Sequence, residues 1–207
     1  MKFVANMTKL SLKQCQVLVG ILLGDASLQT ESGGKTYRLR ICQGEKHKEY
    51  LFHLYDLFEN FTKSPPIKNS SIDKRTGKTY VSWCFATTQQ PCFRFYGQQF
   101  YDQNGRKKVP KIIGKLLKPS SIAYWYMDDG AQKWKGKSRG VRFCTDSFQH
   151  REVQFLAEIL EERYGLKASL ERKGKFRRIY MSTKSYDILK DLIFEFLIPS
   201  MHYKFPD

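Results

Sequence analysis

The sequence predicts an α+β protein that consists of two similar halves, each with the element order αββαββα. Three observations lead to this fold. An apolar helical stretch that ends in an acid occurs twice, at residues 18–25 and 122–130. The same order of helical and strand patterns follows each stretch at a period of 104 residues, which indicates an internal repeat with a pseudo-twofold axis. The Arg-Ile-Cys at 40–42 and the Arg-Phe-Cys at 142–144 also fall at corresponding places.

The first half is expected to begin with a helix from Ser11, whose spacing to Gln14 is that of a capping box, to about Asp25. After it, alternating apolar residues predict strands, and apolar stripes with a period of 3.6 residues predict helices. These patterns predict a hairpin turning at 32–35, a strand over 36–42 with Arg38 and Arg40 facing outward, a helix over 45–62, a hairpin turning at 73–78, a strand over 79–86 and a helix over 90–101.

A basic, turn-rich segment over residues 102–118 is expected to link the halves, so the first half with this linker occupies 1–117 and the second occupies 118–207. Ser120 or Ser121 is expected to cap the second motif helix. The elements predicted after it are a hairpin over 132–145, a helix over 150–164, a hairpin turning at 173–175, and a helix over 184–196 with Ile188, Leu189, Leu192 and Phe196 facing inward.

The charge of the chain points to a polyanionic partner. The net charge is +16 and the sequence pI is about 9.6. Residues 1–117 carry +11 (19 basic and 8 acidic residues) and the rest +5, so both halves are expected to touch the polyanion. Because the positive charge is spread over strands and turns rather than along one amphipathic helix, nucleic acid is favoured over an acidic membrane surface. No run of 18 apolar residues predicts a membrane span.

The cysteines and the start of the chain bear on its compartment. The five cysteines are an odd number without a CxxC pair, so we expect free thiols in a reducing compartment. Met1 to Leu10 show neither a signal-peptide core nor an Arg-rich presequence. The chain is therefore expected to work inside the compartment in which it is made.

The two acid-ended helices carry the strongest functional signal. The last turn of a helix exposes unpaired carbonyls, so Asp25 and Asp129 sit where electrostatics disfavours a carboxylate. Gly20 and Gly24 share one helix face and remove the Cβ atoms that would keep a partner helix away. If the second motif helix is that partner, the two acids arrive side by side and form an oxygen-rich pocket for a hard cation, of which Mg²⁺ is favoured.

The motifs Leu18-Val19-Gly20-Ile21-Leu22-Leu23-Gly24-Asp25 and Ile122-Ala123-Tyr124-Trp125-Tyr126-Met127-Asp128-Asp129-Gly130 resemble the paired LAGLIDADG motifs of homing endonucleases encoded in mobile group I introns, most nearly the I-SceI type. The resemblance covers most of the chain and includes the closing Tyr203-Lys204-Phe205-Pro206. It implies saddle-shaped antiparallel sheets on DNA, with the motif helices between the halves. It also implies a monomer that cuts one phosphodiester in each strand of a long, asymmetric double-stranded DNA site with Mg²⁺.

The resemblance implies a ligand set for the metal. Asp25 and Asp129 would each bind a divalent ion, and the backbone carbonyls of Gly24 and Asp128 would join the coordination. The side chain of Asp128 has no acidic equivalent in the first copy, where Gly24 stands, so we expect it to have a local capping or structural role.

The resemblance also implies a lysine near the attacking water in each half. Lys204 matches this position in the second half. In the first half, a lysine three residues before a proline is Lys107, whereas alignment of the two halves selects Lys108. A phosphate-binding or solvated role is an open alternative for all three lysines.

Gln43 matches a polar active-site position of the family, and its counterpart in the second half is Thr145 or Asp146. The two centres are therefore expected to be chemically unequal. The four histidines form no recognisable constellation and receive no role, and Trp83, Trp125 and Tyr126 are expected to pack in the core.

Arginines on outer strand faces and lysines at hairpin tips suit a two-stranded ribbon in a DNA major groove, although ordinary solvated strand faces look similar. The residues expected to contact DNA are Lys35, Arg38, Arg40, Lys78, Lys133, Lys135, Arg142, Arg172, Lys173, Lys175 and Arg177.

Two alternatives share the same scaffold: an RNA maturase that assists splicing of its own intron, and a DNA-binding protein without catalysis. Intron RNA is thus a further expected partner. The resemblance also suggests a mitochondrial or chloroplast location.

Overall fold

The structure, a computed structural model, describes residues 9–206, so most of the expectation about Met1 to Leu10 lies outside the described residues. The helices are α1 (Leu12–Leu23), α2 (Lys48–Phe58), α3 (Arg94–Phe100), α4 (Ile113–Leu116), α5 (Pro119–Asp129), α6 (His150–Tyr164) and α7 (Thr183–Ile193). The strands are β1 (Ser27–Gln29), β2 (Arg38–Gly44), β3 (Ile67–Ile72), β4 (Thr79–Ala86), β5 (Gly130–Gln132), β6 (Val141–Phe143), β7 (Ala168–Lys173) and β8 (Phe176–Met181). The described residues form two compact units: those up to Cys15 with Asp25–Gln98, and Gln16–Gly24 with those from Gln99 onward.

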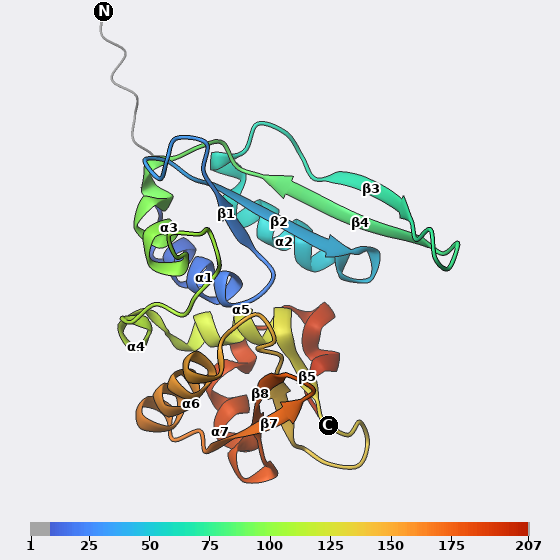
Figure 1. Ribbon diagram of the computed structural model, residues 1–207. Helices are drawn as coiled ribbons and strands as arrows, with labels where there is room; N and C mark the ends of the chain where they lie inside the picture. The colour runs from blue at the N-terminus through green and yellow to red at the C-terminus, as the bar shows by residue number, and fades with distance from the viewer. Residues whose placement is uncertain (1–8, 207) are drawn as a thin grey trace, which may run out of the picture. The chain divides into compact units, whose positions relative to one another are not determined.

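The first unit is an antiparallel sheet in the order β1-β2-β4-β3, with α2 packed against one face (Figure 1). The Phe52 ring of α2 meets Trp83 of β4 edge-on, with the ring centroids 5.5 Å apart. On β2, Leu39 and Ile41 are buried on the helix side while Arg40 is exposed on the other. The predicted alternation of this strand is therefore confirmed, and one sheet face is left open to solvent.

The second unit contains a sheet of the same design, in the order β5-β6-β8-β7, with α6 packed against β7 and β8. The two sheets have equivalent strand orders and antiparallel pairings within the described residues. The predicted internal repeat is therefore confirmed at the level of topology. No helix in the described part of the chain is long and apolar enough to cross a membrane.

The ends of the motif helices differ from the predicted ones. The capping box of α1 is present, because Ser11 N–H donates to Gln14 Oε1 and Gln14 N–H donates to Ser11 Oγ. However, α1 ends at Leu23 rather than at Asp25. The predicted serine cap of α5 is wrong: Lys118 is the N-cap, and Pro119 takes the first helical position, where its missing N–H costs nothing.

The inward face of α7 is rotated relative to the predicted face. Tyr186, Leu189 and Ile193 are buried, whereas Ile188 is 45% exposed. The apolar stripe of this helix is broad enough to suit two rotational positions, and the buried side chains of its own unit select one. The prediction that Ile188 faces inward is wrong.

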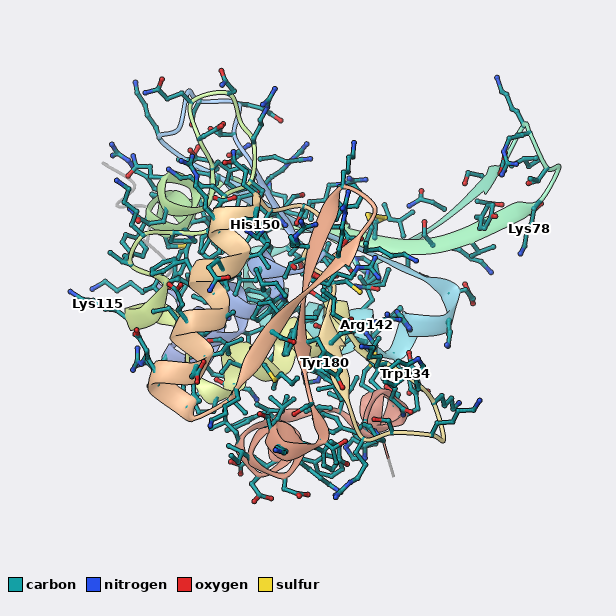
Figure 2. All side chains as sticks on the ribbon, turned by 60° about the horizontal axis from the view of Figure 1, so that its bottom comes forward. Lys78, Lys115, Trp134, Arg142, His150 and Tyr180 are labelled. Atoms are coloured by element: carbon teal, nitrogen blue, oxygen red, sulfur yellow. A yellow bond between two sulfur atoms is a disulfide. The ribbon has the colours of Figure 1, made fainter. Side chains whose placement is uncertain are left out.

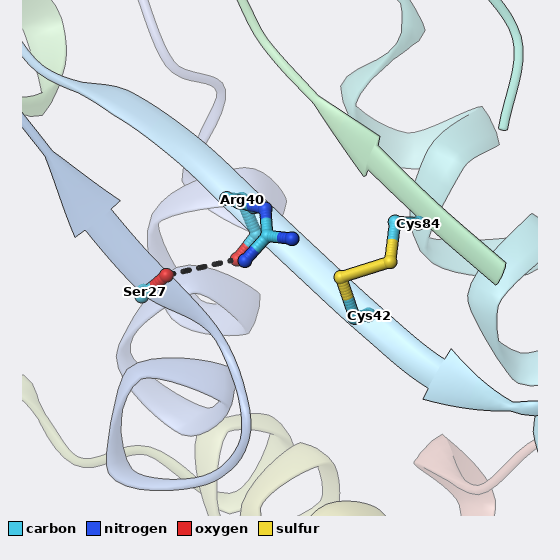
Figure 3. Close-up of a disulfide and its surroundings, with 4 residues drawn as sticks. All are labelled: Ser27, Arg40, Cys42 and Cys84. Atoms are coloured by element: carbon cyan, nitrogen blue, oxygen red, sulfur yellow. Dashed lines mark hydrogen bonds between the residues drawn. A yellow bond between two sulfur atoms is a disulfide. The ribbon is translucent and has the colours of Figure 1, made fainter. Parts of the chain in front are cut away.

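Two of the five cysteines are not free thiols. Cys42 and Cys84 form a disulfide between β2 and β4, on the open face of the first sheet beside Arg40 (Figure 3). They are direct partners in the strand register, with their Cα atoms 4.1 Å apart, although 42 residues separate them in sequence. The prediction of five free thiols is therefore wrong for this pair, because pairing across a sheet leaves no signal in local spacing.

A thiol count tests this pairing. Alkylation of protein that was purified without reductant and then denatured is expected to modify three cysteines, namely Cys15, Cys92 and Cys144. Intact mass gives the number of alkyl groups, and a sample reduced before alkylation serves as the control in which all five react. Modification of five cysteines in the unreduced sample would contradict the disulfide.

Candidate active site

Helices α1 and α5 cross at the two glycines of the first motif. A Cβ at Gly20 would lie 2.3 Å from the Ser121 carbonyl oxygen, and one at Gly24 would lie 2.3 Å from Asp128 Oδ2. Real Cβ atoms do not approach so closely, so these positions require glycine. The predicted close crossing is confirmed, and the side chain of Asp128 occupies the space that Gly24 leaves open. The residues directly before Asp25 and Asp129 therefore meet at the crossing.

A lysine ammonium caps the carboxyl end of each motif helix. Lys107 Nζ donates to the Gly24 carbonyl at 2.7 Å. Lys204 Nζ donates to the Asp128 carbonyl at 2.9 Å and also to that of Met127. Positive charge at this end of a helix offsets its dipole. The lysines therefore explain how the chain tolerates an aspartate at each of these helix ends.

The two lysines predicted as alternatives for the first half, Lys107 and Lys108, make different contacts. The side chain of Lys107 reaches Gly24, in the same way as that of Lys204 reaches the matching carbonyl of the second motif. For Lys108 the main-chain N–H donates to the Phe100 carbonyl at 2.8 Å, which closes the turn after α3. The pseudosymmetric position is thus that of Lys107.

The closing segment is tied to the second unit through its backbone, and this fixes Lys204. The Tyr126 hydroxyl donates to the Lys204 carbonyl at 2.8 Å, and Gln132 Nε2 donates to that of Phe205 at 2.6 Å. Burial raises the pKa of Tyr126 well above its usual value, so the phenol stays protonated and remains a donor. Tyr126 and Trp125 are fully buried, which confirms the core role predicted for these two aromatics.

Gln43 and Asp25 are joined by a hydrogen bond in the first unit. Asp25 is exposed just past the end of α1, and Gln43 is only 5% exposed near the end of β2. Gln43 Nε2 donates to Asp25 Oδ2 at 2.9 Å. On its other side, Gln43 Oε1 lies 3.3 Å from His47 Nδ1. Sequence reasoning assigned no role to His47, and only the fold of the turn after β2 brings it to Gln43.

The second half has a different arrangement at the equivalent place. Asp129 is the last residue of α5, and its carbonyl accepts from Cys144 N–H at 2.9 Å. This pairing continues the β5–β6 register and makes Thr145, rather than Asp146, the counterpart of Gln43. Thr145 Oγ1 donates to the Arg177 carbonyl at 2.7 Å. Burial raises the pKa of the Cys144 thiol, which keeps it neutral close to Asp129.

The oxygen donors at the motif ends fit a hard divalent cation. Among residues 9–206 no three His, Cys, Asp or Glu side chains are grouped so that they could hold a metal by themselves. Each motif end offers instead one aspartate and neighbouring main-chain carbonyls. Mg²⁺ is commonly held by one or two carboxylates, with water and substrate phosphates completing its octahedron. The donor set therefore suits an ion whose coordination is completed by nucleic-acid phosphate.

The basic residues predicted to contact DNA in the first unit lie where expected. Arg38 and Arg40 are on the open face of the sheet, and Arg38 is oriented by Gln29 Oε1, which accepts from its Nε at 3.0 Å. Lys35 is exposed in the loop before β2, and Lys78 is exposed at the tip of the β3–β4 hairpin (Figure 2). This face therefore presents cations at its rim and on its surface.

In the second unit, the open sheet face is built from a different set of arginines than predicted. Arg142 pairs with Tyr180 in the register, and because the residues on either side of each are buried, both lie on this open face. Arg177 is instead on the side of the buried Ile179, and Arg172 is its cross-strand partner. The predicted outer-face position is therefore wrong for Arg172 and Arg177, because the buried residues of β8 set the alternation one residue differently.

The residue that takes the outer position is Arg178, which sequence reasoning missed. Its Nε donates to Asp146 Oδ1 at 2.7 Å, and its Nη2 donates to the other oxygen. This fork lowers the pKa of Asp146 and raises that of Arg178, so both remain charged. Counting alternation back from Met181 and Ile179 would have found Arg178 in the sequence.

Lysines surround the same face of the second unit. Lys133 is paired with Glu171 and lies over the Tyr180 ring. Lys173 and Lys175 are exposed at the β7–β8 turn. Lys135 lines a cavity of about 570 Å³ together with Lys137 and Arg139 beside the β5–β6 hairpin. Positive charge thus extends from the sheet onto both hairpins.

Two αββαββα copies in one chain, each with an aspartate at the end of its first helix, define a class of single-chain, two-motif proteins. The sequence model of the LAGLIDADG DNA endonuclease family matches residues 15–189 of this chain. The chain belongs to this family, as its motifs predicted.

Known proteins resemble the chain over nearly its whole length. It is 34% identical to the DNA endonuclease I-ChuI of Chlamydomonas applanata, with 96% of both chains covered. It is 32% identical to the cytochrome b mRNA maturase bI2 of Debaryomyces hansenii, with 97% of this chain and 77% of that protein covered. The homing endonuclease I-WcaI bound to its DNA recognition sequence has the same fold, at a TM-score of 0.89 and 27% identity, with 95% of this chain and 87% of that chain covered. The predicted fold class is therefore confirmed.

Proposed function

We propose that this protein is a site-specific DNA endonuclease that cuts both strands of a long, asymmetric double-stranded site and promotes homing of a group I intron. The observation that carries the proposal is the twin arrangement at the helix ends, where Lys107 and Lys204 each hold the carbonyl next to a motif aspartate. Family membership and the likeness to I-ChuI and I-WcaI support it. Since both copies lie in one chain, the protein acts as a monomer.

Asp25 and Asp129 are the proposed metal ligands, and the carbonyls of Gly24 and Asp128 are further candidate donors. The cation is proposed to be Mg²⁺; when bound, it lowers the pKa of a water molecule and stabilises charge on the scissile phosphate. Gln43 orients the Asp25 carboxylate through its amide.

Lys107 and Lys204 are the proposed active-site lysines. Each ammonium is held at a helix end before DNA arrives, so it stabilises developing phosphate charge without reorganisation.

DNA is proposed to lie along the open faces of the two sheets. Arg38, Arg40 and Arg142 would face the bases, where arginine can pair with guanine in a bidentate way. The remaining contacts would go to phosphates from the hairpins and strand ends, namely Lys35, Lys78, Lys133, Lys135, Lys173 and Lys175. To this set the structure adds Arg178 as a candidate.

A maturase activity is the second candidate, and the likeness to the maturase bI2 favours it specifically. The same relative supports an organellar, intron-encoded origin as a proposal. We also propose that the repeat divides into residues 1–117, with the basic linker, and 118–207.

Plasmid cleavage tests the function. A supercoiled plasmid that carries the joined exons flanking the gene is expected to be linearised in Mg²⁺, spared in EDTA, and cut again when excess Mg²⁺ is restored. The control is the same plasmid with the intron still in place, which interrupts the site. A plasmid that stays intact while precursor RNA is spliced faster in the presence of the protein would favour the maturase instead.

A further inference from the structure

The amide of Gln43 is held at both ends within the first unit. Its Nε2 donates to Asp25 Oδ2 at 2.9 Å, and its Oε1 lies 3.3 Å from His47 Nδ1. A glutamine amide can be turned by 180°, which exchanges its donor and its acceptor. An imidazole that donates from Nδ1 to Oε1 selects the orientation in which the NH₂ group faces the carboxylate. The reverse orientation would place two oxygen acceptors against each other at Asp25.

The backbone after β2 places His47 for this contact. The strand passes into a single 3-10 turn, Glu45–His47, and His47 is then the N-cap residue of α2. The turn is anchored on its other side, because Trp83 Nε1 donates to Glu45 Oε2 at 2.7 Å. Trp83 is also the register partner of Gln43. The imidazole and the amide are therefore carried by one short segment whose ends are both fixed to the first sheet.

The second half lacks the chemistry for the same arrangement. Thr145 stands at the position of Gln43, and its hydroxyl donates to the Arg177 carbonyl. Four residues further along, where His47 stands in the first half, is Gln149. Its side chain is engaged in the capping box of α6 with Glu152. Thr145 and Gln149 therefore do not repeat the contact that Gln43 and His47 make in the first half.

We propose that His47 is a positioning residue for the Asp25 centre, which it serves by fixing the orientation of Gln43. The inference rests on the proposed role of Asp25 in metal binding. His47 acts on this centre through Gln43, whose amide oxygen its imidazole contacts. Loss of the imidazole removes the contact that selects one orientation of the Gln43 amide, so the Asp25 carboxylate loses a fixed donor and its orientation relaxes. The consequence is confined to the strand cut at the first centre.

Strand-resolved cleavage tests this. A duplex of the joined exons, labelled on one strand at a time, is cut in Mg²⁺ by the wild type, His47→Ala, His47→Asn, Gln43→Ala and the His47→Ala/Gln43→Ala double variant. His47→Ala is expected to lower the cleavage rate of one strand tenfold or more, and this strand should be the one whose cleavage Gln43→Ala also slows. The cleavage rate of the other strand should stay within twofold of the wild type, and the Kd for DNA should be unchanged. Asparagine offers an N–H near the place of Nδ1, so the cleavage rate of this strand by His47→Asn is expected to lie within threefold of the wild-type rate.

The double variant and two further proteins distinguish a positioning role from a general effect on the fold or on DNA binding. In the Gln43→Ala background, His47→Ala is expected to have no added effect, because its target is gone. The matched control is His150→Ala, at the start of α6 in the other half, which should cleave as the wild type does (Figure 2). Equal slowing of both strands, or a full His47→Ala effect without Gln43, overturns the proposal. If Asp25→Asn still cuts normally, the proposed function itself fails; if Asp25→Asn is inactive and His47→Ala is normal, only this inference fails.

Discussion

Asp25→Asn and Asp129→Asn are each expected to abolish double-strand cleavage while DNA binding persists. Asparagine keeps the shape of the side chain but removes the negative charge that makes it a ligand for a hard cation. Loss of a group that only supports a metal ligand typically costs about 10–100-fold, so loss of the ligand should slow cleavage by more than about 100-fold. Binding should stay equal or become tighter, because one negative charge near the DNA phosphates has been removed.

The measurement is the rate of linear product formation from the exon-junction plasmid, with Kd determined separately in Ca²⁺. Asp191→Asn provides the control, since this carboxylate is exposed on α7 and its loss makes the same change in net charge. Linearisation by either motif variant at near the wild-type rate in Mg²⁺ would remove that aspartate from the metal site. Loss of DNA affinity in step with cleavage would instead indicate a disrupted fold.

Gly20→Ala is expected to lower the free energy of unfolding by about 2 kcal/mol. Alanine is favoured over glycine within a helix by about 1 kcal/mol. Against this, the new Cβ would lie 2.3 Å from the Ser121 carbonyl oxygen and 2.9 Å from Tyr124 Cβ. Overpacking typically costs about 1–3 kcal/mol, and a backbone carbonyl cannot rotate away, so the upper end applies. The clash therefore outweighs the gain in helix propensity, and α1 and α5 must separate.

Urea unfolding followed by circular dichroism measures this difference, with the slope of the transition checked for a change in cooperativity. Gly44→Ala is the matched control, because its φ of −64° suits any residue and no atom lies within 4 Å of the added Cβ. Its stability should stay within about 0.5 kcal/mol of the wild type, as for most surface substitutions. A Gly20→Ala protein as stable as the wild type would show that the helices do not cross as closely as described.

Local sequence patterns predicted most of the secondary structure of this protein. The capping box at Ser11, the alternation of β2 and the apolar stripe of α6 are written in short stretches, and each was predicted where the structure has it. Errors arose where two local readings were equally good. The apolar stripe of α7 could be centred on either Ile188 or Leu189, and either Arg177 or Arg178 could face outward from β8. Packing against the rest of the unit made the choice in both cases.

The candidate site shows the same limit for contacts that no local pattern specifies, most of which join residues far apart in the chain. Lys107 lies 83 residues from the Gly24 carbonyl that it binds, and neighbouring Lys108 has the same chemistry. Cys42 and Cys84 look like separate thiols until the register of β2 and β4 brings them opposite each other. The role of His47 depends on one 3-10 turn that folds back on the end of a strand. None of these pairings has a periodic signal.

By itself the sequence determined that the chain is a basic, internally repeated α+β protein of the LAGLIDADG family. It also determined that an aspartate stands at the end of each of the two motif helices, of which the first contains glycine and the second is rich in aromatic residues. These properties follow from residue type and spacing along a single element. Only the tertiary structure decided which lysine caps the first motif helix, which arginines share the open face of the second sheet, and which imidazole orients Gln43. Each of those choices depends on a few ångströms between atoms that chain folding brings together, and residue spacing along the sequence does not encode such distances.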